Sequence, residues 1–357
     1  QEAAPATEAL EWHAPVMVRI DEHTTIPHLL KERVQRGATR PLILRKVGIG
    51  DTWRSISARD FYDEVQSVAA GLMARGLKPG DRVAIMSRTR YEWTLLDFAC
   101  WAAALVPVPI YETSSIDQVA HVLVDADVTL IVTETVSMAE IVRAAAEREH
   151  RDNTHVLSLD SEAIETLIAE GATVPRDRVA ARADKLTTDD IATIVYTSGT
   201  TGTPKGTVLS HENFTNLCLN AHSWMPEIAA GKDSRLLLFL PLAHVFARFL
   251  QVFQISGNGV LGHASNIKNL LGDLASFKPS YLLVVPRVLE KIYNSADTKA
   301  SGPKRKIFRW AAKVAIAYSQ ALDTEEGPSA SLKAQHALAD KLVYQQIIRL
   351  VGGNADY

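Results

Sequence analysis

The sequence predicts an α/β fold in which mostly parallel sheets are flanked by helices. Short apolar runs of strand length alternate along the 357 residues with amphipathic stretches of helix length. This alternation is typical of βαβ units, whose crossover helices cover both faces of a parallel sheet. Hydrophobic residues make up 47% and charged residues 22%, as in other globular chains. We expect one large unit, which could contain two sheets, because no repeat or low-complexity linker divides the chain.

The predicted elements follow one another after a loose lead-in over residues 1–25. Residues 58–75 place apolar side chains at helical spacing, and Gly76 lies where such a helix would end. From about residue 303 the chain is predicted to be largely helical, with a polar loop at 323–329. Buried strands are predicted at 83–86, 128–132, 155–159, 191–196, 236–240 and 281–285.

Three further helix starts are indicated by their capping residues. Ser115 with Gln118, and Ser137 with Glu140, have the spacing of a capping box, in which each side chain bonds the backbone amide of the other residue. A third helix could start near Ser210.

Several classes of protein are excluded by composition and pattern. A net charge of −3, spread along the chain, gives no reason to expect a nucleic-acid partner. Cys100 and Cys218 lie in apolar stretches, so we expect buried free thiols and a reducing cytoplasm rather than a disulfide framework. The first basic residue is Arg19, unlike the start of a secretory signal. The longest uncharged run, 249–267, contains too many polar side chains to span a membrane, so we expect a soluble protein.

The most informative stretch is 196–206, Tyr-Thr-Ser-Gly-Thr-Thr-Gly-Thr-Pro-Lys-Gly, which follows an apolar strand. Its glycines let the backbone turn tightly and bring amides close to an anion, while its hydroxyls supply neutral donors. Lys205 adds a mobile positive charge. The stretch therefore predicts a loop around a polyphosphate. It is not a Walker A loop, in which Ser or Thr follows the lysine. On composition alone, a flexible surface turn is the alternative.

The whole string resembles the phosphate-loop signature of adenylate-forming enzymes, which include acyl-CoA synthetases, peptide-synthetase adenylation domains and luciferases. Residues 235–248 are similar to the family's strand-Pro-x-x-His segment beside the acyl pocket. Residues 278–293 resemble a stretch typical of long-chain fatty acid members. The family's N-terminal landmarks resemble 90–93, Asp97 and 109–115. The resemblance runs from about Trp53 to the last residue, with Ala-Ala-Leu at 103–105 in place of the usual Gly-Ala-Val, a change expected to affect packing only.

The resemblance implies a long-chain fatty acid:CoA ligase. Such an enzyme joins a fatty acid to ATP, releases pyrophosphate, and transfers the acyl group from the acyl-adenylate to coenzyme A. ATP, Mg²⁺, coenzyme A and a long-chain fatty acid are therefore the expected cofactors and partners. Two alternatives stay open. The chain could adenylate another carboxylic acid, such as an aryl acid or an amino acid, or it could be a nucleotide-binding module without catalysis.

The resemblance also assigns roles to residues. Lys205 and His244 are the expected catalytic residues, and Thr200 is the expected hydroxyl ligand of Mg²⁺. For His244 the alternative is a satisfied core histidine. Arg248 is a weaker site candidate, because an arginine after an apolar strand is often a surface group. The ATP phosphates are expected to contact Thr197, Ser198, Gly199, Thr200, Thr201, Gly202, Thr203, Lys205 and Gly206.

The family's later motifs are not found in these residues. An aromatic-Gly-x-Thr-Glu motif, a ribose-binding aspartate and a small C-terminal domain with a catalytic lysine would normally follow. Residues 1–357 are therefore expected to be a partial N-terminal AMP-binding (adenylation) domain, incomplete at its C-terminal end and inactive by itself. The basic run 304–306 near Phe308 and Trp310 could touch a membrane surface peripherally, although a solvated helix face is the ordinary reading.

Overall fold

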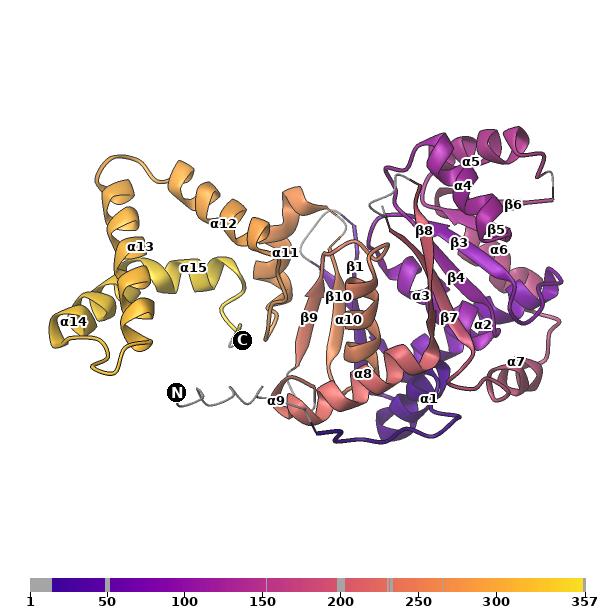
Figure 1. The fold of residues 1–357 in the computed structure, drawn as a ribbon, viewed down its shortest axis with the longest axis horizontal. Coiled ribbons are helices and arrows are strands. Elements are labelled where there is room, and N and C mark those ends of the chain that lie inside the picture. The colour runs from indigo at the N-terminus through magenta and orange to yellow at the C-terminus, as the bar shows by residue number, and fades with distance from the viewer. Residues whose placement is uncertain are drawn as a thin grey trace, which may run out of the picture.

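Two four-stranded sheets stand side by side in the protein, with a two-stranded ribbon beside the second sheet (Figure 1). The computed structural model describes residues 15–48, 52–151, 153–197, 203–229, 231, 234–264 and 266–355. The predicted α/β fold with mostly parallel sheets flanked by helices is confirmed.

The first sheet has the strand order β2-β1-β10-β9. Strand β1 pairs in parallel with β10, and β10 with β9, whereas β2 runs antiparallel to β1. The carboxyl ends of β1, β9 and β10 therefore meet at one edge, where α/β proteins commonly place their sites. The strands are β1 Pro41–Lys46, β2 Trp53–Ser57, β9 Arg235–Leu238 and β10 Val260–His263.

The second sheet, β4-β3-β5-β6, is parallel throughout. Along β3, Val83 and Ile85 join the larger hydrophobic core, whereas Ala84 and Met86 join a second core on the opposite face. This alternation follows from the two-residue period of a strand, and it explains why the run is apolar throughout. The strands are β3 Arg82–Met86, β4 Val106–Ile110, β5 Val128–Thr133 and β6 His155–Ser158. The antiparallel ribbon consists of β7 Ile191–Thr197 and β8 Lys205–Ser210.

Helices cover both sheets and extend into an arm. In Figure 1, α8 and α10 lie in front of the first sheet, α4 and α5 flank the second, and α12 to α15 project away from both. The helices of the sheet region are α1 Ile26–Gly37, α2 Ala58–Ala74, α3 Tyr91–Ala102, α4 Ile116–Asp125, α5 Val136–Arg148, α6 Ala163–Gly171, α7 Arg176–Ala183, α8 His211–Trp224, α9 Pro226–Ala229, α10 Val245–Ser256 and α11 Leu270–Phe277. Those of the arm are α12 Pro286–Lys299, α13 Gly302–Leu322, α14 Ala330–Ala339 and α15 Gln345–Leu350. Single turns occur at η1 Leu159–Ser161, η2 Ile267–Asn269 and η3 Asp340–Tyr344.

Most of the sequence-based elements are confirmed. Ser115 and Gln118 form a capping box at α4, and Ser210 caps α8 with the help of Asn213. Helix α13 ends just before the predicted polar loop. The two cysteines are free and buried. Among the residues described, no helix combines the length and apolar character needed to cross a membrane.

The strand predicted at 281–285 is wrong. These residues form no ladder, and α12 starts directly after them. Ser280 exchanges hydrogen bonds with the start of β9, but the pairing goes no further. The apolar character of the segment comes from packing, since Leu282 and Val284 lie against the core around Phe277.

The helix start predicted at Ser137 is also wrong. Helix α5 begins at Val136, and its N-cap is Thr135, whose hydroxyl accepts a hydrogen bond from the amide of Met138. Strand β5 ends only two residues before Thr135, so the earlier hydroxyl already lies at the turn and takes the capping position.

Candidate functional site

The β7–β8 ribbon carries the predicted phosphate loop at its open end. Thr197 is the register partner of Lys205, so the structure brings these two predicted site residues together. Thr197, Thr203 and Lys205 are exposed, as groups that meet a soluble ligand must be. The other predicted loop residues, Ser198, Gly199, Thr200, Thr201 and Gly202, lie outside the described residues.

Gly206 has a packing role that the sequence did not indicate. It lies within β8, opposite Tyr196, rather than in a tight turn. A Cβ atom at this position would come within 2.8 Å of the Ile194 side chain and 3.0 Å of the Tyr196 ring. Glycine is therefore needed here for the close approach of a ring from the neighbouring strand.

Helix α4 holds the ribbon next to the loop. The Tyr196 hydroxyl donates a hydrogen bond to Asp125 (2.6 Å), and the His121 ring lies 2.8 Å from the carbonyl oxygen of Pro204. The two rings also meet edge to face. Burial, together with the Asp125 carboxylate, raises the pKa of the Tyr196 hydroxyl, so the phenol keeps its proton. Sequence reasoning missed His121 and Asp125, although their four-residue spacing places both on one helix face.

His244 lies at the first turn of α10, after the carboxyl end of β9. Its Nδ1 accepts a hydrogen bond from the amide of Phe246 (3.2 Å), so the neutral ring carries its proton on Nε2. The side chain is exposed, which rules out the alternative of a core histidine. Among the described residues, His244 makes no hydrogen bond to Thr197, Thr203 or Lys205.

The surface position expected for Arg248 is wrong. Its side chain is 0% exposed and forms an ion pair with Asp97, which is 1% exposed. Arg248 Nε lies 3.0 Å and Nη2 2.7 Å from the two carboxylate oxygens. Helix α10 turns this position inward, and the partner carboxylate lies about 150 residues earlier in the chain, so local sequence contained no sign of the pair.

Further polar groups continue from this pair to β10. Gln251 Nε2 donates to Asp97, and the Thr94 hydroxyl donates to Gln251 Oε1 (2.8 Å). Since the Thr94 proton is used there, its oxygen must accept the remaining bond, from His263 Nε2 at 2.7 Å. Burial lowers the pKa of His263 to about 4, so its ring is neutral.

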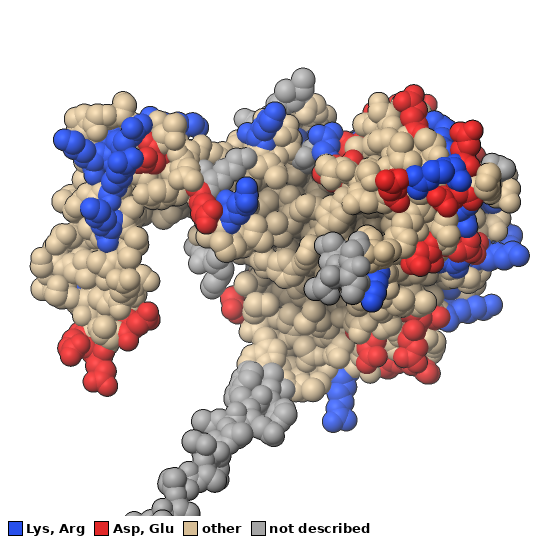
Figure 2. Space-filling view, turned by 45° about the horizontal axis from the view of Figure 1, so that its top comes forward, with Lys and Arg blue, Asp and Glu red and all other residues tan. Residues whose placement is uncertain are grey.

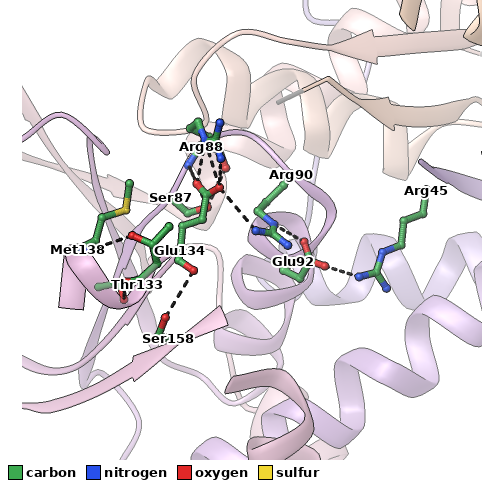
Figure 3. Close-up of polar contacts among 10 residues, drawn as sticks. Arg45, Ser87, Arg88, Arg90, Glu92, Thr133, Glu134, Met138 and Ser158 are labelled. Carbon is green, nitrogen blue, oxygen red and sulfur yellow. Dashed lines mark hydrogen bonds and ion pairs between the residues drawn. The ribbon is translucent and has the colours of Figure 1, made fainter. Parts of the chain in front are cut away.

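A polar pocket of about 420 Å³ lies at the carboxyl ends of β1 and β10, next to the segments that follow β3 and β5. Figure 3 shows Arg88 and Arg90 converging on Glu134, while Arg90 and Arg45 bind the two oxygens of Glu92. Burial alone would raise the pKa of Glu134, yet the hydrogen bonds from Arg88 hold the pKa of this carboxyl below its usual value. The arginines are therefore held in place by ionised carboxylates.

Thr89 connects this pocket to His244. The pocket is lined by Thr89 among other residues. The Thr89 hydroxyl donates a hydrogen bond to the carbonyl of Leu240 (2.7 Å) and accepts one from the amide of Leu242 (3.1 Å). These two residues lie just before His244, so the pocket wall and the predicted catalytic histidine share one backbone segment.

Comparisons with known proteins show which family the chain belongs to. Residues 30–336 match the AMP-binding enzyme family. The chain belongs to this family. Among AMP-binding enzymes it is similar to the long-chain-fatty-acid–CoA ligases of Mycobacterium bovis and Mycobacterium tuberculosis, each 38% identical over 96% of this chain and 57% of the relative. A peroxisomal long-chain acyl-CoA synthetase of Arabidopsis thaliana is 32% identical over 82% of this chain and 42% of the relative. The chain thus spans about half the length of these AMP-binding enzymes.

Solved structures show the same fold. The crystal structure of VinN superposes with a TM-score of 0.65 at 16% identity, over 79% of this chain and 66% of that one. A fatty acyl CoA synthetase of Mycobacterium tuberculosis superposes with a TM-score of 0.62 at 23% identity, over 76% of this chain and 51% of that one. These likenesses show that the covered part of the chain has the same fold as these proteins.

The site can supply several positive and hydrogen-bonding groups to an anionic ligand. Lys205 and the hydroxyls of Thr197 and Thr203 lie exposed beside the loop. In the part of the chain that the structure describes, no three His, Cys, Asp or Glu side chains are arranged to hold a metal ion.

Proposed function

We propose that this chain binds ATP within an enzyme that activates a long-chain fatty acid as its adenylate and passes the acyl group to coenzyme A. The observation that carries the proposal is the likeness to the two mycobacterial long-chain-fatty-acid–CoA ligases, which extends over nearly the whole chain. Residues 1–357 would form the partial N-terminal AMP-binding domain, with the small C-terminal domain outside them.

The first step would join two anions. A carboxylate oxygen attacks the α-phosphorus of ATP, the bond to the bridging oxygen breaks, and pyrophosphate leaves. Donors and positive charge around the phosphates offset the repulsion and stabilise the crowded phosphorus. Lys205 and the hydroxyls and amides of 197–206 would hold the β- and γ-phosphates. His244, with its proton on Nε2, would donate a hydrogen bond where the carboxylate meets the α-phosphate.

Mg²⁺ would supply further positive charge on the phosphates. Thr200 is the proposed hydroxyl ligand, and water with phosphate oxygens would complete the coordination, as Mg²⁺ prefers. The exposed hydroxyls of Thr197 and Thr203 on either side of the loop suit such a site.

We also propose a cytoplasmic location, supported by the two free, buried cysteines, with peripheral membrane contact through the arm. Figure 2 shows Lys and Arg side chains gathered at one end of this arm. Lys304 and Lys306 are exposed there, whereas Arg305 donates to carbonyl oxygens at the end of α12 and Phe308 is buried. Within the run 304–306, the two exposed lysines each add about 1 kcal/mol of attraction to an anionic surface, so the membrane contact is proposed as peripheral, and no nucleic-acid partner is proposed.

ATP–pyrophosphate exchange by the full-length enzyme tests the function. We expect exchange with acids of palmitate-like length to be much faster than with acetate or benzoate, since each buried methylene adds about 0.8 kcal/mol to binding. An optimum at short, aryl or amino acids would instead support the second candidate, adenylation of another acid. No exchange with any acid would leave only the nucleotide-binding module.

The same assay tests the phosphate loop. Lys205→Ala should slow adenylate formation at least about tenfold, which corresponds to about 1.4 kcal/mol of transition-state stabilisation. The fold should survive, because Lys205 is exposed. Lys333→Ala, an exposed lysine on α14, is the matched control and should exchange at the parent rate. Equal rates for all three proteins would contradict the role of Lys205.

A further inference from the structure

The buried guanidinium of Arg248 connects the helix turn that bears His244 with the strand that leads into the phosphate loop. Arg248 lies one helical turn after His244 on α10, and its amide donates to the carbonyl of His244 at 3.4 Å. Besides the ion pair with Asp97, its Nη1 donates to the hydroxyl of Thr193 in β7. Thr193 precedes Thr197, where the phosphate loop begins, by four residues of continuous strand.

Each of the three nitrogens of this guanidinium donates a hydrogen bond to a buried partner. Asp97 accepts from Nε and Nη2 at the same time, which fixes the plane of the group. Nη1 donates to the hydroxyl of Thr193, which in turn donates a hydrogen bond to the carbonyl of Pro107 in β4 at 2.7 Å. The guanidinium also lies over the ring of Trp101, 5.5 Å from its centroid. These contacts fix the position of the Arg248 side chain. Through them, α10 is hydrogen-bonded to α3 and β7, and β7 is hydrogen-bonded to β4.

Lysine could not reproduce this arrangement. Its single nitrogen can pair with the Asp97 carboxylate, but it cannot also present a fork to both oxygens and a third donor to Thr193 in a fixed plane. Burying such a pair is a weak source of stability, because desolvation offsets most of the Coulomb attraction. Its geometry, rather than its energy, distinguishes it from an apolar contact of the same volume.

We propose that Arg248 is a positioning residue, which holds the helix turn bearing His244 at a fixed distance from the strand that leads into the phosphate loop. This inference rests on the proposed adenylation function. Adenylation needs the carboxylate and the ATP phosphates to be held together, and displacements near 1 Å can cost about a hundredfold in rate. Loss of the Arg248–Thr193 bond should then lower turnover while ATP still binds.

The test uses conservative variants of the full-length enzyme in ATP–pyrophosphate exchange. Thr193→Val keeps the shape of the side chain and removes the hydroxyl, whereas Thr193→Ser keeps the hydroxyl. We expect kcat to fall at least about fivefold in Thr193→Val, with the KM for ATP within about twofold of the parent, and to stay near the parent value in Thr193→Ser. Arg248→Lys should repeat the loss seen with Thr193→Val.

Thr215→Val is the control for buried threonine loss. Thr215 is fully buried, and its hydroxyl donates to the carbonyl of His211 within α8 rather than to β7 or α10. It should lower the melting temperature without lowering kcat. Parent-like kcat in Thr193→Val or in Arg248→Lys, or an equal loss in Thr215→Val, would overturn the proposal. If kcat falls in Thr193→Val but not in Arg248→Lys, the loss comes from the hydrogen bond between Thr193 and Pro107 instead.

Hydrogen–deuterium exchange separates this inference from the function on which it rests. Thr193→Val and Arg248→Lys should speed amide exchange in the first turn of α10 and in β8, and Thr215→Val should leave both segments unchanged. Unchanged protection in the two site variants would refute the positioning role even in a protein that adenylates nothing. Altered protection without any pyrophosphate exchange in the parent would refute the function and keep the connection between the two segments.

Discussion

Ala104 has a backbone conformation that alanine rarely adopts. Its φ is +55°, in the left-handed region, directly after the end of α3. The amide of Leu105 donates to the carbonyl of Cys100, and the amide of Ala104 donates to that of Trp101. These two bonds form a Schellman motif, whose left-handed position glycine normally fills. The usual Gly-Ala-Val also has alanine at the position of Ala104, so this strain does not come from the departure at residues 103 and 105.

Ala104→Gly should stabilise the protein. Relief of the left-handed strain is worth about 1–2 kcal/mol, and the greater freedom of glycine in the unfolded chain removes about 0.5–1 kcal/mol of that. We expect the free energy of unfolding in urea to rise by about 0.5–1 kcal/mol. Ala103→Gly, at a right-handed neighbour with φ −89°, should lower it instead. A loss of stability in Ala104→Gly would show that the alanine methyl contributes more than its strain.

At the scale of whole elements, α2 and α6 approach each other so closely that their contact has no room for a side chain. A Cβ on Gly71 of α2 would lie 2.0 Å from the carbonyl oxygen of Leu167 in α6, and one on Gly171 would lie 2.4 Å from the Gly71 amide. Both neighbours are backbone atoms, which cannot turn away as a side chain can. This contact sets the distance between α2 and α6.

Gly71→Ala should therefore destabilise the fold, by at least about 2 kcal/mol, because the two helices must separate. Gly272→Ala is the matched control, since Gly272 is an exposed helical glycine in α11 with no atom within 4 Å of a new Cβ. There the better helix propensity of alanine should add about 0.5–1 kcal/mol. We expect the free energy of unfolding in urea to fall in Gly71→Ala and to rise in Gly272→Ala. A rise in both variants would mean that helix propensity outweighs the close contact.

At the scale of the whole molecule, α3 connects the sheets. All of its residues are buried. Thr94 bonds to β10, Asp97 to α10 and Trp101 to β7. Nearby, His211 accepts a hydrogen bond from the amide of Ile26 at the start of α1 and lies edge-on to Trp101. Burial lowers the pKa of both His211 and His263 to about 4.

These two imidazoles should make stability depend on pH. Their pKa is about 4 in the folded protein, against 6.5 for the solvated imidazole of an unfolded chain, so the unfolded chain binds more protons between those values. The stability that depends on these two neutral histidines is present above pH 6.5 and is lost as the pH falls toward 4. Each histidine should remove about 2 kcal/mol between pH 7 and pH 5.

The measurement is the free energy of urea unfolding at both pH values. His211→Asn keeps an acceptor near Nδ1, and His263→Gln keeps a donor near Nε2, so each variant should flatten the dependence without removing the bond to Ile26 or Thr94. An unchanged difference between pH 7 and pH 5 in the double variant would mean that other groups cause it.

Local sequence determined much of this protein. The continuous apolar run of 83–86 and the capping residues Ser115 and Ser210 specified elements that formed where expected, because their physical causes are short-range. The phosphate-loop string was visible for the same reason, since its eleven residues are contiguous. Its frame, a strand on each side, followed from the apolar residues that flank it.

Tertiary structure decided whatever depends on a distant partner. From local sequence Arg248 was expected to be a surface group, but the fold brings Asp97 and Thr193 to it from two other elements. Segment 281–285 has the composition of a strand but no described neighbour to pair with, and a strand exists only through its partner's hydrogen bonds. The tie from Thr89 to the segment before His244 likewise joins residues about 150 positions apart. Burial and pairing across such separations are properties of the folded chain, and local pattern carries no record of them.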